Sequence, residues 1–501
     1  MAGRIKLPTG RAGALLAIIG GAVLLRLIGG VGFANYDTLY ALGWGGQLAR
    51  AQAPAYEIPV APTPHPLVEA LGALLEPLGP RAAAGVTVWL GLLALSACAW
   101  VVYALGSEWF GRPAGALAGL LILTRVPVLS YGVRAYVDVP YLLLVLSAVL
   151  VETRRPRAGA PVLMLLALAG LLRPEAWVFS ALYWLYLLPG WKTTPRPSAT
   201  TGEGARPGTP PASATAAWQG ELLKLALLAL SAPLVWLLSD LAVTGDPLWS
   251  LTNTRHTAQA LGRVRGIANV PEYIPRRIGE ILRPSVLAGG ALGAALSLLW
   301  LRRAALSALA VAAVALVVFA VLAAAGLPIN TRYAFLLAAI GCILCGAGAL
   351  GWTRLRDDPA RKRWWMLGGA IVVVALLAAT PGQYRAADRE LSKLARQQHI
   401  EGDLVALVKD GAISLRCGKV GVSNHAPIPL LALYLKTSPR NIVNAQLGRV
   451  QGRGVYVDPA SREVERDYVL DPHDPVVPVS VPPGFREAGT NRSWLIFRRC
   501  A

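Results

Sequence analysis

The sequence predicts an α-helical polytopic membrane protein of about eleven transmembrane helices, followed by a small C-terminal extracytoplasmic α+β domain. First, 55% of the 501 residues are hydrophobic and 15% are charged, whereas a soluble globular protein has about 25% charged residues. Second, the apolar residues gather in runs that reach or approach the ~20 residues needed to cross a bilayer. Third, residues 382–501 lack such runs and instead show short alternating segments.

Eleven apolar runs carry the helix prediction. They fall at 12–33, 83–105, 113–124, 139–151, 160–172, 176–190, 220–243, 285–301, 304–328, 332–351 and 365–381. The first run lacks a small-residue cleavage site followed by a polar mature domain, so we expect it to be retained as a helix.

Positive charge sets the expected orientation. Every second loop is basic, beginning with the loops that hold Arg4, Lys6 and Arg11, then Arg154, Arg155 and Arg157, then Lys192 and Arg196, Arg302 and Arg303, and Arg354, Arg356, Arg361, Lys362 and Arg363. By the positive-inside rule the N-terminus is cytoplasmic and the C-terminal domain extracytoplasmic. This topology explains the net charge of +20, and no nucleic-acid partner is expected because the basic stretches lack interleaved stacking aromatics.

Two domains are predicted: residues 1–381 in the membrane and residues 382–501 outside it. The Pro-, Ser-, Thr- and Gly-rich segment 192–218 is predicted to be a disordered cytoplasmic loop. In the outer domain the alternating segments 403–408, 454–458 and 493–497 follow a predicted amphipathic helix near 384–399. Cys417 and Cys500 lie in an oxidising compartment, where they either form a disulfide or remain free.

Broken helices predict a polar cavity in the outer half of the bundle. Runs 113–124 and 139–151 are too short to span, and the segment between them contains Arg125, Arg134 and Asp138. A second break, at 173–175, contains Arg173 and Glu175. Polar broken backbone at membrane depth is tolerated only where it lines protein or a water-filled cavity.

Two carboxylates are the candidate catalytic groups. Asp37 follows the first apolar run, and Asp138 ends the first break. A carboxylate near the membrane is costly unless it is paired or functional. The pair could act as a general base on a hydroxyl, or hold a divalent cation such as Mg or Mn through Asp138. The alternative is that each aspartate only caps a helix.

The predicted outer loop 244–284 is rich in arginine on the side where arginine should be scarce. It contains Arg255, His256 and Arg263 among its basic residues. Guanidinium groups match phosphate oxygens, so a phosphate-bearing donor would explain this exception. A solvated helix face, or contact with anionic lipid headgroups, is the alternative.

Other residues are placed by topology at the same cavity, each with a structural alternative. Arg26 could pair with a phosphate or snorkel to the interface, and Arg332 could close the cavity or meet headgroups. Arg173 and Glu175 could simply pair with each other, and His65 could be only a hydrogen-bonding residue. The full set of further cavity or donor candidates is Arg26, Tyr56, His65, Arg134, Arg173, Glu175, Arg332 and Tyr333.

This pattern resembles the GT-C superfamily of integral-membrane glycosyltransferases, especially the protein O-mannosyltransferase and aminoarabinose-transferase branch. The similarity rests on Asp37, on Asp138 in "RAYVDVP", on His65-Pro66-Leu67, and on the segments "LLRPEAW" and "NTRYAFL". Asp37 is followed by Thr38 where the family often has Asp-Glu, and Pro66 is followed by Leu67 where it has a second Pro. The resemblance covers the membrane part loosely and the last domain only by its position.

The resemblance implies a bacterial membrane glycosyltransferase that takes a sugar from a polyprenyl-phosphate donor and gives it to an acceptor hydroxyl by inverting displacement. The acceptor would be a glycan, a lipid or a protein. Two alternatives stay open. A transporter or flippase of a lipid-linked or anionic substrate predicts internal pseudo-symmetry and polar residues at the bilayer midplane. A non-catalytic lipid-binding subunit predicts that Asp37 tolerates substitution.

Overall fold

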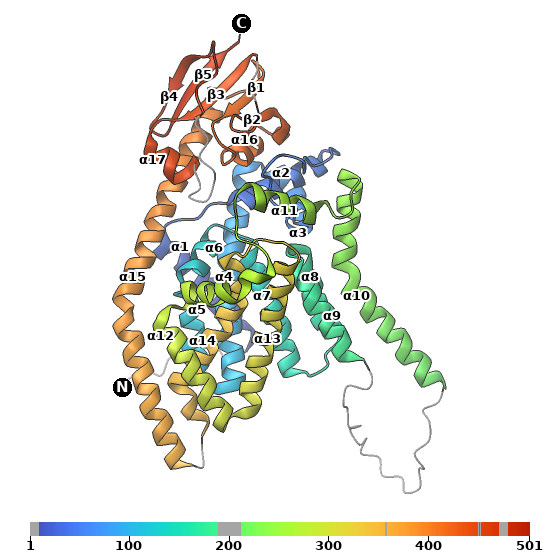
Figure 1. Ribbon diagram of the computed structural model, residues 1–501, viewed down its shortest axis with the longest axis vertical. Coiled ribbons are helices and arrows are strands. Elements are labelled where there is room, and N and C mark those ends of the chain that lie inside the picture. Colours follow the sequence, from blue (N-terminus) through green and yellow to red (C-terminus); the bar gives the residue numbers. More distant parts are fainter. Residues whose placement is uncertain are drawn as a thin grey trace.

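The computed structural model describes residues 10–188, 212–355, 358–448, 450, 452–469 and 479–500. It consists of a bundle of long helices with a small sheet domain at one end (Figure 1). We call the end of the bundle next to the sheet the sheet end, and the opposite end the far end. Residues 192–211 of the predicted disordered loop lie outside the described residues, and the next helix begins at Ala212.

All eleven predicted runs lie on helices. These are α1 (Arg11–Gly29), α4 (Pro80–Phe110), α5 (Arg112–Leu123), α7 (Asp138–Arg154), α8 (Ala160–Leu172), α9 (Glu175–Leu187), α10 (Ala212–Thr244), α12 (Val270–Trp300), α13 (Arg302–Ala324), α14 (Phe335–Leu350) and α15 (Pro359–Lys409). The prediction of a polytopic helical membrane protein is therefore confirmed.

Fewer helices than the eleven apolar runs pass a test of length and composition for a membrane span. Seven helices of the described chain are long and apolar enough to cross a membrane, or eight if the bent pair of α5 and α6 (Val126–Val133) counts as one span. The helices α7, α8 and α9 have 17, 13 and 13 residues. At about 1.5 Å per residue, the two shorter ones reach only ~20 Å, less than the ~30 Å bilayer core.

Close helix packing in the bundle depends on small residues. α14 is the most deeply buried long helix and packs against α12. A methyl group on Gly293 of α12 would lie 1.8 Å from the Leu344 carbonyl oxygen. Small residues at such crossings let backbones approach closely where no hydrophobic force drives association in lipid. This contact fixes α14, and with it the segment Thr331–Ala334 that precedes it at the sheet end.

Arg125 is buried at the predicted break 125–138 and does not reach a cavity. α5 and α6 meet there at 63°. Its guanidinium donates to the carbonyl oxygens of Leu121 at 3.1 Å and Leu282 at 2.8 Å. Leu282 precedes Arg283, whose positive φ interrupts α12 before Pro284. Arg125 thus satisfies carbonyl groups at two broken helices, as backbone breaks in a membrane require.

Four short helices cover the sheet end: α2 (Tyr36–Ala49), α3 (Pro66–Leu75), α6 and α11 (Trp249–Ala260). The α+β domain above them has five strands in the order β2-β1-β3-β5-β4. Its elements are β1 (Lys419–Val422), α16 (Ile428–Tyr434), β2 (Ile442–Asn444), β3 (Gly454–Pro459), α17 (Arg462–Val464), β4 (Arg486–Thr490) and β5 (Trp494–Arg499). β1 pairs in parallel with β2 and β3, and β5 pairs antiparallel with β3 and β4.

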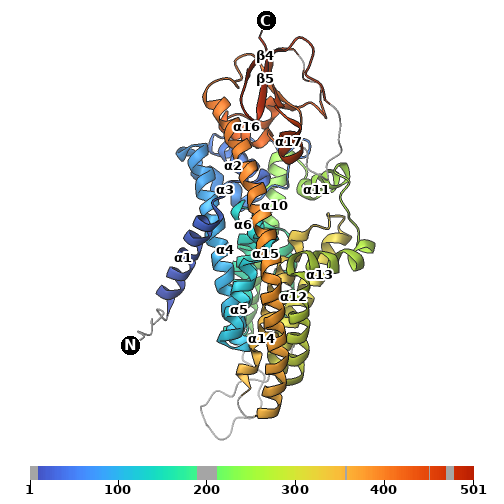
Figure 2. The same cartoon turned by 90° about the vertical axis from the view of Figure 1, so that its left-hand side faces the viewer.

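Two of the alternating sequence segments are strands and one is not. Residues 454–458 lie in β3 and 494–497 in β5, whereas 403–408 are the last turns of α15. Ile400, Leu404 and Leu407 are buried at helical spacing in the core shared with the sheet. α15 thus runs from the far end of the bundle to the sheet domain (Figure 2). A disulfide joins Cys417, just before β1, to Cys500, just after β5.

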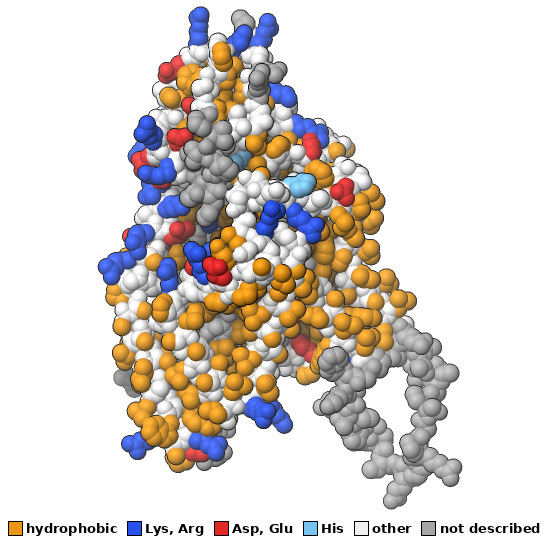
Figure 3. Space-filling view, viewed as in Figure 1, with side chains coloured by type: hydrophobic (Ala, Val, Ile, Leu, Met, Phe, Trp, Pro, Cys, Tyr) orange, Lys and Arg blue, Asp and Glu red, His pale blue; other side chains and the backbone are white. Residues whose placement is uncertain are grey.

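The surface separates into zones along this long axis. Figure 3 shows a broad hydrophobic band over the bundle, Lys and Arg side chains beyond its lower edge, and charges of both signs around the sheet domain. Helix ends contact one another at the far end: Arg154 pairs with Glu108 at 2.8 Å, and Arg354 donates to the Glu108 carbonyl oxygen at 2.6 Å. The basic loops after α7 and α14 therefore lie at the same end.

Candidate active site

A cavity of about 740 Å³ lies between the sheet end of the bundle and the C-terminal domain. This is in the range of small-molecule sites. Its walls come from segments distant in sequence: the start of α2, the 173–178 segment, α10, α11, the end of α13, α15 and residues 466–469. Predicted site residues that line it are Asp37, His65, Arg134, Arg173, Glu175, Arg263, Arg332 and Tyr333.

Asp37 presents its carboxylate to this cavity because another residue caps α2. The Asn35 side chain accepts from the backbone N–H groups of Asp37 at 2.8 Å and Thr38 at 3.2 Å. Asn35 is itself fixed by donating to the Arg134 carbonyl oxygen at 2.9 Å. The Asp37 side chain is thus free of the capping role and lies in the first helical turn, where the helix dipole favours a negative charge.

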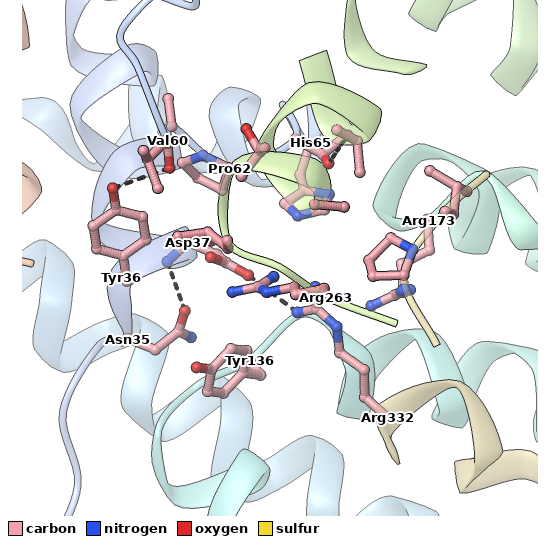
Figure 4. A pocket seen from close by; sticks show the side chains of 18 of the residues that line it. Asn35, Tyr36, Asp37, Val60, Pro62, His65, Tyr136, Arg173, Arg263 and Arg332 are labelled. Carbon is pink, nitrogen blue, oxygen red and sulfur yellow. Dashed lines mark hydrogen bonds and ion pairs between the residues drawn. The ribbon is translucent and has the colours of Figure 1, made fainter. Parts of the chain in front are cut away.

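Arginines and carboxylates alternate along one wall. Arg332 lies 3.1 Å from Asp37 Oδ2 and 3.7 Å from Asp138 Oδ2. Arg173 pairs with Asp138 and donates from Nε to Glu175 Oε1 at 3.0 Å. The Tyr333 ring lies beneath both guanidinium groups, 4.7 Å from that of Arg173 and 5.9 Å from that of Arg332. Figure 4 shows Asp37, His65, Arg173, Arg263 and Arg332 converging on one space.

This arrangement does not fit the divalent cation that the sequence suggested at Asp138. Asp138 is 2% exposed, and its carboxylate faces Arg173 and Arg332. A metal ion there would have to displace buried guanidinium groups that already neutralise the carboxylate. Within the described part of the chain, no group of three or more His, Cys, Asp or Glu could hold a metal ion.

The arginines around the cavity differ in what they already bind. Arg134 lies over the Tyr136 ring at 4.9 Å and donates to Ser130 Oγ at 2.9 Å. The Arg263 guanidinium makes no hydrogen bond or ion pair within the described residues. Its loop is pinned beside the site, because Val264 accepts a hydrogen bond from Ile329 at 2.8 Å. Arg263 is therefore an uncommitted cation near Asp37 (Figure 4).

Five predicted candidates lie outside this cavity's lining: Asp138, which is buried behind Arg173 and Arg332, and Arg26, Tyr56, Arg255 and His256. Arg255 donates to the Ala325 carbonyl oxygen at 2.5 Å, which holds α11 to the end of α13. His256 is exposed on the outer face of α11. Arg26 lies in the last turn of α1, and the buried Tyr56 hydroxyl donates to Glu69.

His65 lines the cavity and is 6% exposed. Burial lowers the pKa of His65 to about 4, so its ring is neutral at pH 7. Its Nδ1 has no hydrogen-bond partner among the described residues. The cavity lining also contains residues that the sequence analysis did not select, namely Trp177, Trp236, Asp240, Ser250 and Thr254. Asp240 was detectable as a carboxylate inside the apolar run 220–243.

No family profile and no curated protein sequence matches the chain. Several solved structures do match the chain. ArnT from Cupriavidus metallidurans matches at a TM-score of 0.55 with undecaprenyl phosphate bound and 0.56 in the apo state. In both comparisons the identity is 13%, covering 97% of this chain and 98% of that chain. The apo oligosaccharyltransferase of Archaeoglobus fulgidus matches at a TM-score of 0.51 and 12% identity, covering 91% of this chain and 69% of that chain.

The likeness to ArnT runs through the bundle and the C-terminal domain, since nearly all of both chains is covered. This chain therefore shares the fold of ArnT and of that oligosaccharyltransferase, with a small C-terminal α+β domain.

Proposed function

We propose that this protein is a glycosyltransferase that moves a sugar from a polyprenyl-phosphate donor to an acceptor hydroxyl with inversion. The observation that carries the proposal is one cavity that presents the Asp37 carboxylate beside the uncommitted Arg263 guanidinium. A base and a phosphate-binding cation are the two groups this displacement needs. The fold supports the proposal, since ArnT has been crystallised with undecaprenyl phosphate.

In the proposed step, Asp37 takes the proton of the acceptor hydroxyl. The hydroxyl oxygen forms a bond to the anomeric carbon from the face opposite the phosphate. The bond between that carbon and the phosphate oxygen breaks, and its electron pair leaves with the polyprenyl phosphate. Arg263 stabilises the charge that develops on the leaving phosphate. Arg332 orients Asp37 across 3.1 Å, and Asp138 holds Arg332 and Arg173 in place.

An apolar wall of the cavity fits the polyprenyl chain. It is formed by Val178 of α9, Leu237 of α10, and Val321 and Leu322 of α13. The Val321 side chain is 44% exposed and α10 is mostly unburied, so this wall borders the zone that lipid would occupy. A lipid chain placed there brings its phosphate to the polar part of the same cavity.

The proposal includes an orientation. The basic loops after α7 and α14 meet at the far end, which the positive-inside rule assigns to the cytoplasm. The site and the C-terminal domain would then be extracytoplasmic. Chemical labelling of a cysteine introduced at Ser461 in intact cells, with a cysteine introduced at the exposed Ala360 of the far end as the control, tests this. Labelling of the Ala360 variant alone contradicts the orientation.

The test of function is turnover by the purified protein in lipid vesicles. A panel of radiolabelled polyprenyl-phosphate sugars is scored for release of polyprenyl phosphate, comparing wild type with Asp37→Asn and Arg263→Gln. We expect Asp37→Asn to lower kcat at least ~100-fold while donor binding persists. We expect Arg263→Gln to weaken donor binding and kcat together. Glu272→Gln, at an exposed carboxylate that does not line the cavity, is the control.

Equal turnover by wild type and Asp37→Asn would remove Asp37 as the base. If no donor is turned over while a labelled lipid-linked sugar crosses the vesicle membrane, the alternative of a transporter or flippase is supported. Because two arginines already neutralise Asp138, we expect EDTA to leave turnover within about twofold. Loss of turnover that Mg or Mn restores would contradict this assignment of the carboxylates.

A further inference from the structure

One wall of the cavity carries polar atoms that have no partner. It is formed by His65, by Glu175 and Trp177 at the start of α9, and by Trp236 and Asp240 of α10. Three of its atoms, His65 Nδ1, Glu175 Oε2 and Trp236 Nε1, make no hydrogen bond within the described residues. These side chains are only 6%, 4% and 3% exposed. Buried polar groups are nearly always paired, so each of these needs an explanation.

The aromatic rings of this wall are held in a fixed arrangement. Trp177 and Trp236 meet edge to face with centroids 5.7 Å apart, and His65 meets Trp236 in the same way at 6.2 Å. Trp177 Nε1 donates to the Gly170 carbonyl oxygen at 3.2 Å. Any side chain at Gly170 would meet Trp177 and Ala232 within about 3 Å. The wall is therefore preorganised by the contact of α8, α9 and α10.

Polar groups around the rings are also fixed. Asp240 accepts from the backbone N–H and the hydroxyl of Ser250, both at 2.8 Å. The Thr63 and Thr254 hydroxyls meet at 2.6 Å. Rigid aromatic faces with a few oriented acceptors and donors are what a ring bearing several hydroxyl groups requires.

From this wall, and resting on the proposed function, we infer that the transferred sugar binds against His65, Glu175, Trp177 and Trp236, and that the sugar carries no charge. The Glu175 oxygen without a partner accepts from a sugar hydroxyl, and the Trp236 N–H donates to a sugar oxygen. The charge of Glu175 is already matched by Arg173 at 3.0 Å. Both Asp240 oxygens already accept hydrogen bonds from Ser250. In the proposed step Arg263 is occupied by the phosphate, so the wall offers no further cation for an acidic sugar, and Arg173 and Arg332 already pair with the carboxylates that an amino sugar would need.

The test measures binding to the full-length protein in detergent. The probes share one polyprenyl phosphate, either bare or carrying a neutral hexose (glucose, mannose or galactose), glucosamine or glucuronic acid. We expect at least one neutral hexose to bind at least about tenfold tighter than the bare lipid, and the amino and acidic sugars to give no such gain. Trp236→Phe keeps a ring but removes the N–H. This variant should bind the neutral hexose probe about five- to tenfold more weakly than the wild type does, and should bind the bare lipid equally well.

A matched control is Trp184→Phe. Trp184 lies on α9, but its Nε1 donates to the Leu222 carbonyl oxygen and it does not line the cavity. This variant should bind every probe like the wild type. A gain for the charged sugars only, or a gain that Trp236→Phe leaves intact, overturns the inference. Failure of the wild type to bind even the bare polyprenyl phosphate overturns the proposed function instead, so the two failures are distinguishable.

Discussion

Charge compensation between single residues shapes the site. Arg173 and Arg332 bind three carboxylates, and the contact of Arg332 with Asp37 joins positions 295 residues apart in sequence. Burying any one of these charges alone would cost about 3–5 kcal/mol of desolvation free energy. They are tolerated together as a set because each charge is neutralised by its neighbours. The set explains how a polar site persists at the end of an apolar bundle.

Removing Arg173 should therefore destabilise the protein strongly. Arg173→Met leaves Asp138 and Glu175 buried without their main cation, and we expect a loss of about 3–5 kcal/mol. Arg154→Met removes an exposed pair with Glu108 and should cost at most ~1 kcal/mol. Thermal unfolding in one detergent compares the two. Equal losses of stability in the two variants would show that the contacts of Arg173 with Asp138 and Glu175 do not stabilise the protein more than an exposed ion pair does.

Glu69 should make stability depend on pH. Burial raises the pKa of Glu69 from 4.5 to about 7, so between these values the folded protein holds a proton that the unfolded chain has released. Stability contributed by this group is full below pH 4.5 and falls as the pH rises to about 7, by up to ~3 kcal/mol.

Glu69→Gln should remove that pH dependence. As the pH rises from 4.5 to 7, the unfolding temperature of the variant should increase relative to that of the wild type. Above pH 7 the difference between the two should stay constant. Glu272→Gln should show no such change. A constant difference across this range would contradict the raised pKa.

At the scale of elements, the position of Asp37 depends on how closely α2 packs on α3. A methyl group on Gly45 would lie 2.2 Å from the Glu69 carbonyl oxygen and 2.6 Å from the Ala73 nitrogen. Backbone atoms cannot yield as a flexible side chain can. A methyl group on Gly43, two residues earlier on α2, would meet no atom within 4 Å.

Gly45→Ala should push α2 away from α3, destabilise the protein by about 1–3 kcal/mol, and lower turnover because Asp37 moves with α2. Gly43→Ala should be neutral or gain about 0.5–1 kcal/mol from helix propensity. Unfolding temperature and kcat, measured on both variants, check this. A fall in turnover of equal size in both would assign the effect to helix stiffness instead of packing.

The elements show how far sequence reasoning extends. The apolar runs predict every long helix, because lipid exposure and burial both select apolar side chains locally. The break at 125–138 is visible as a polar segment, but the burial of Arg125 against Leu282 depends on α12, which is distant in sequence. Asp37 stands out after an apolar run, whereas Trp236 looks like any other apolar residue of its helix. Pairings such as Arg332 with Asp37 depend on the fold.

At the scale of the whole molecule, the C-terminal domain forms part of the cavity wall through residues 466–469 and His425. α16 of this domain packs with α2 in one shared hydrophobic core. Its sheet is closed by the Cys417–Cys500 disulfide, which spans 83 residues. The stability of this domain should therefore influence the site.

Removing the disulfide should loosen the domain before the bundle. Cys417→Ser with Cys500→Ser should cost roughly 2–4 kcal/mol within the domain. Hydrogen exchange of the full-length protein should speed up in β4 and β5 and stay unchanged in α14. Faster exchange in α14 as well would mean that the two parts unfold together.

α15 gives the molecule a mechanical property. Its 51 residues form a rod of about 77 Å, which begins at the far end and contributes Lys393, Leu394 and Gln397 to the cavity wall. Pro381 removes one of its backbone hydrogen bonds, but we expect a tilt of this helix in the lipid to move the cavity wall above it. Because bilayer thickness affects helix tilt, we expect vesicles of different acyl-chain length to show different turnover with no change in the protein.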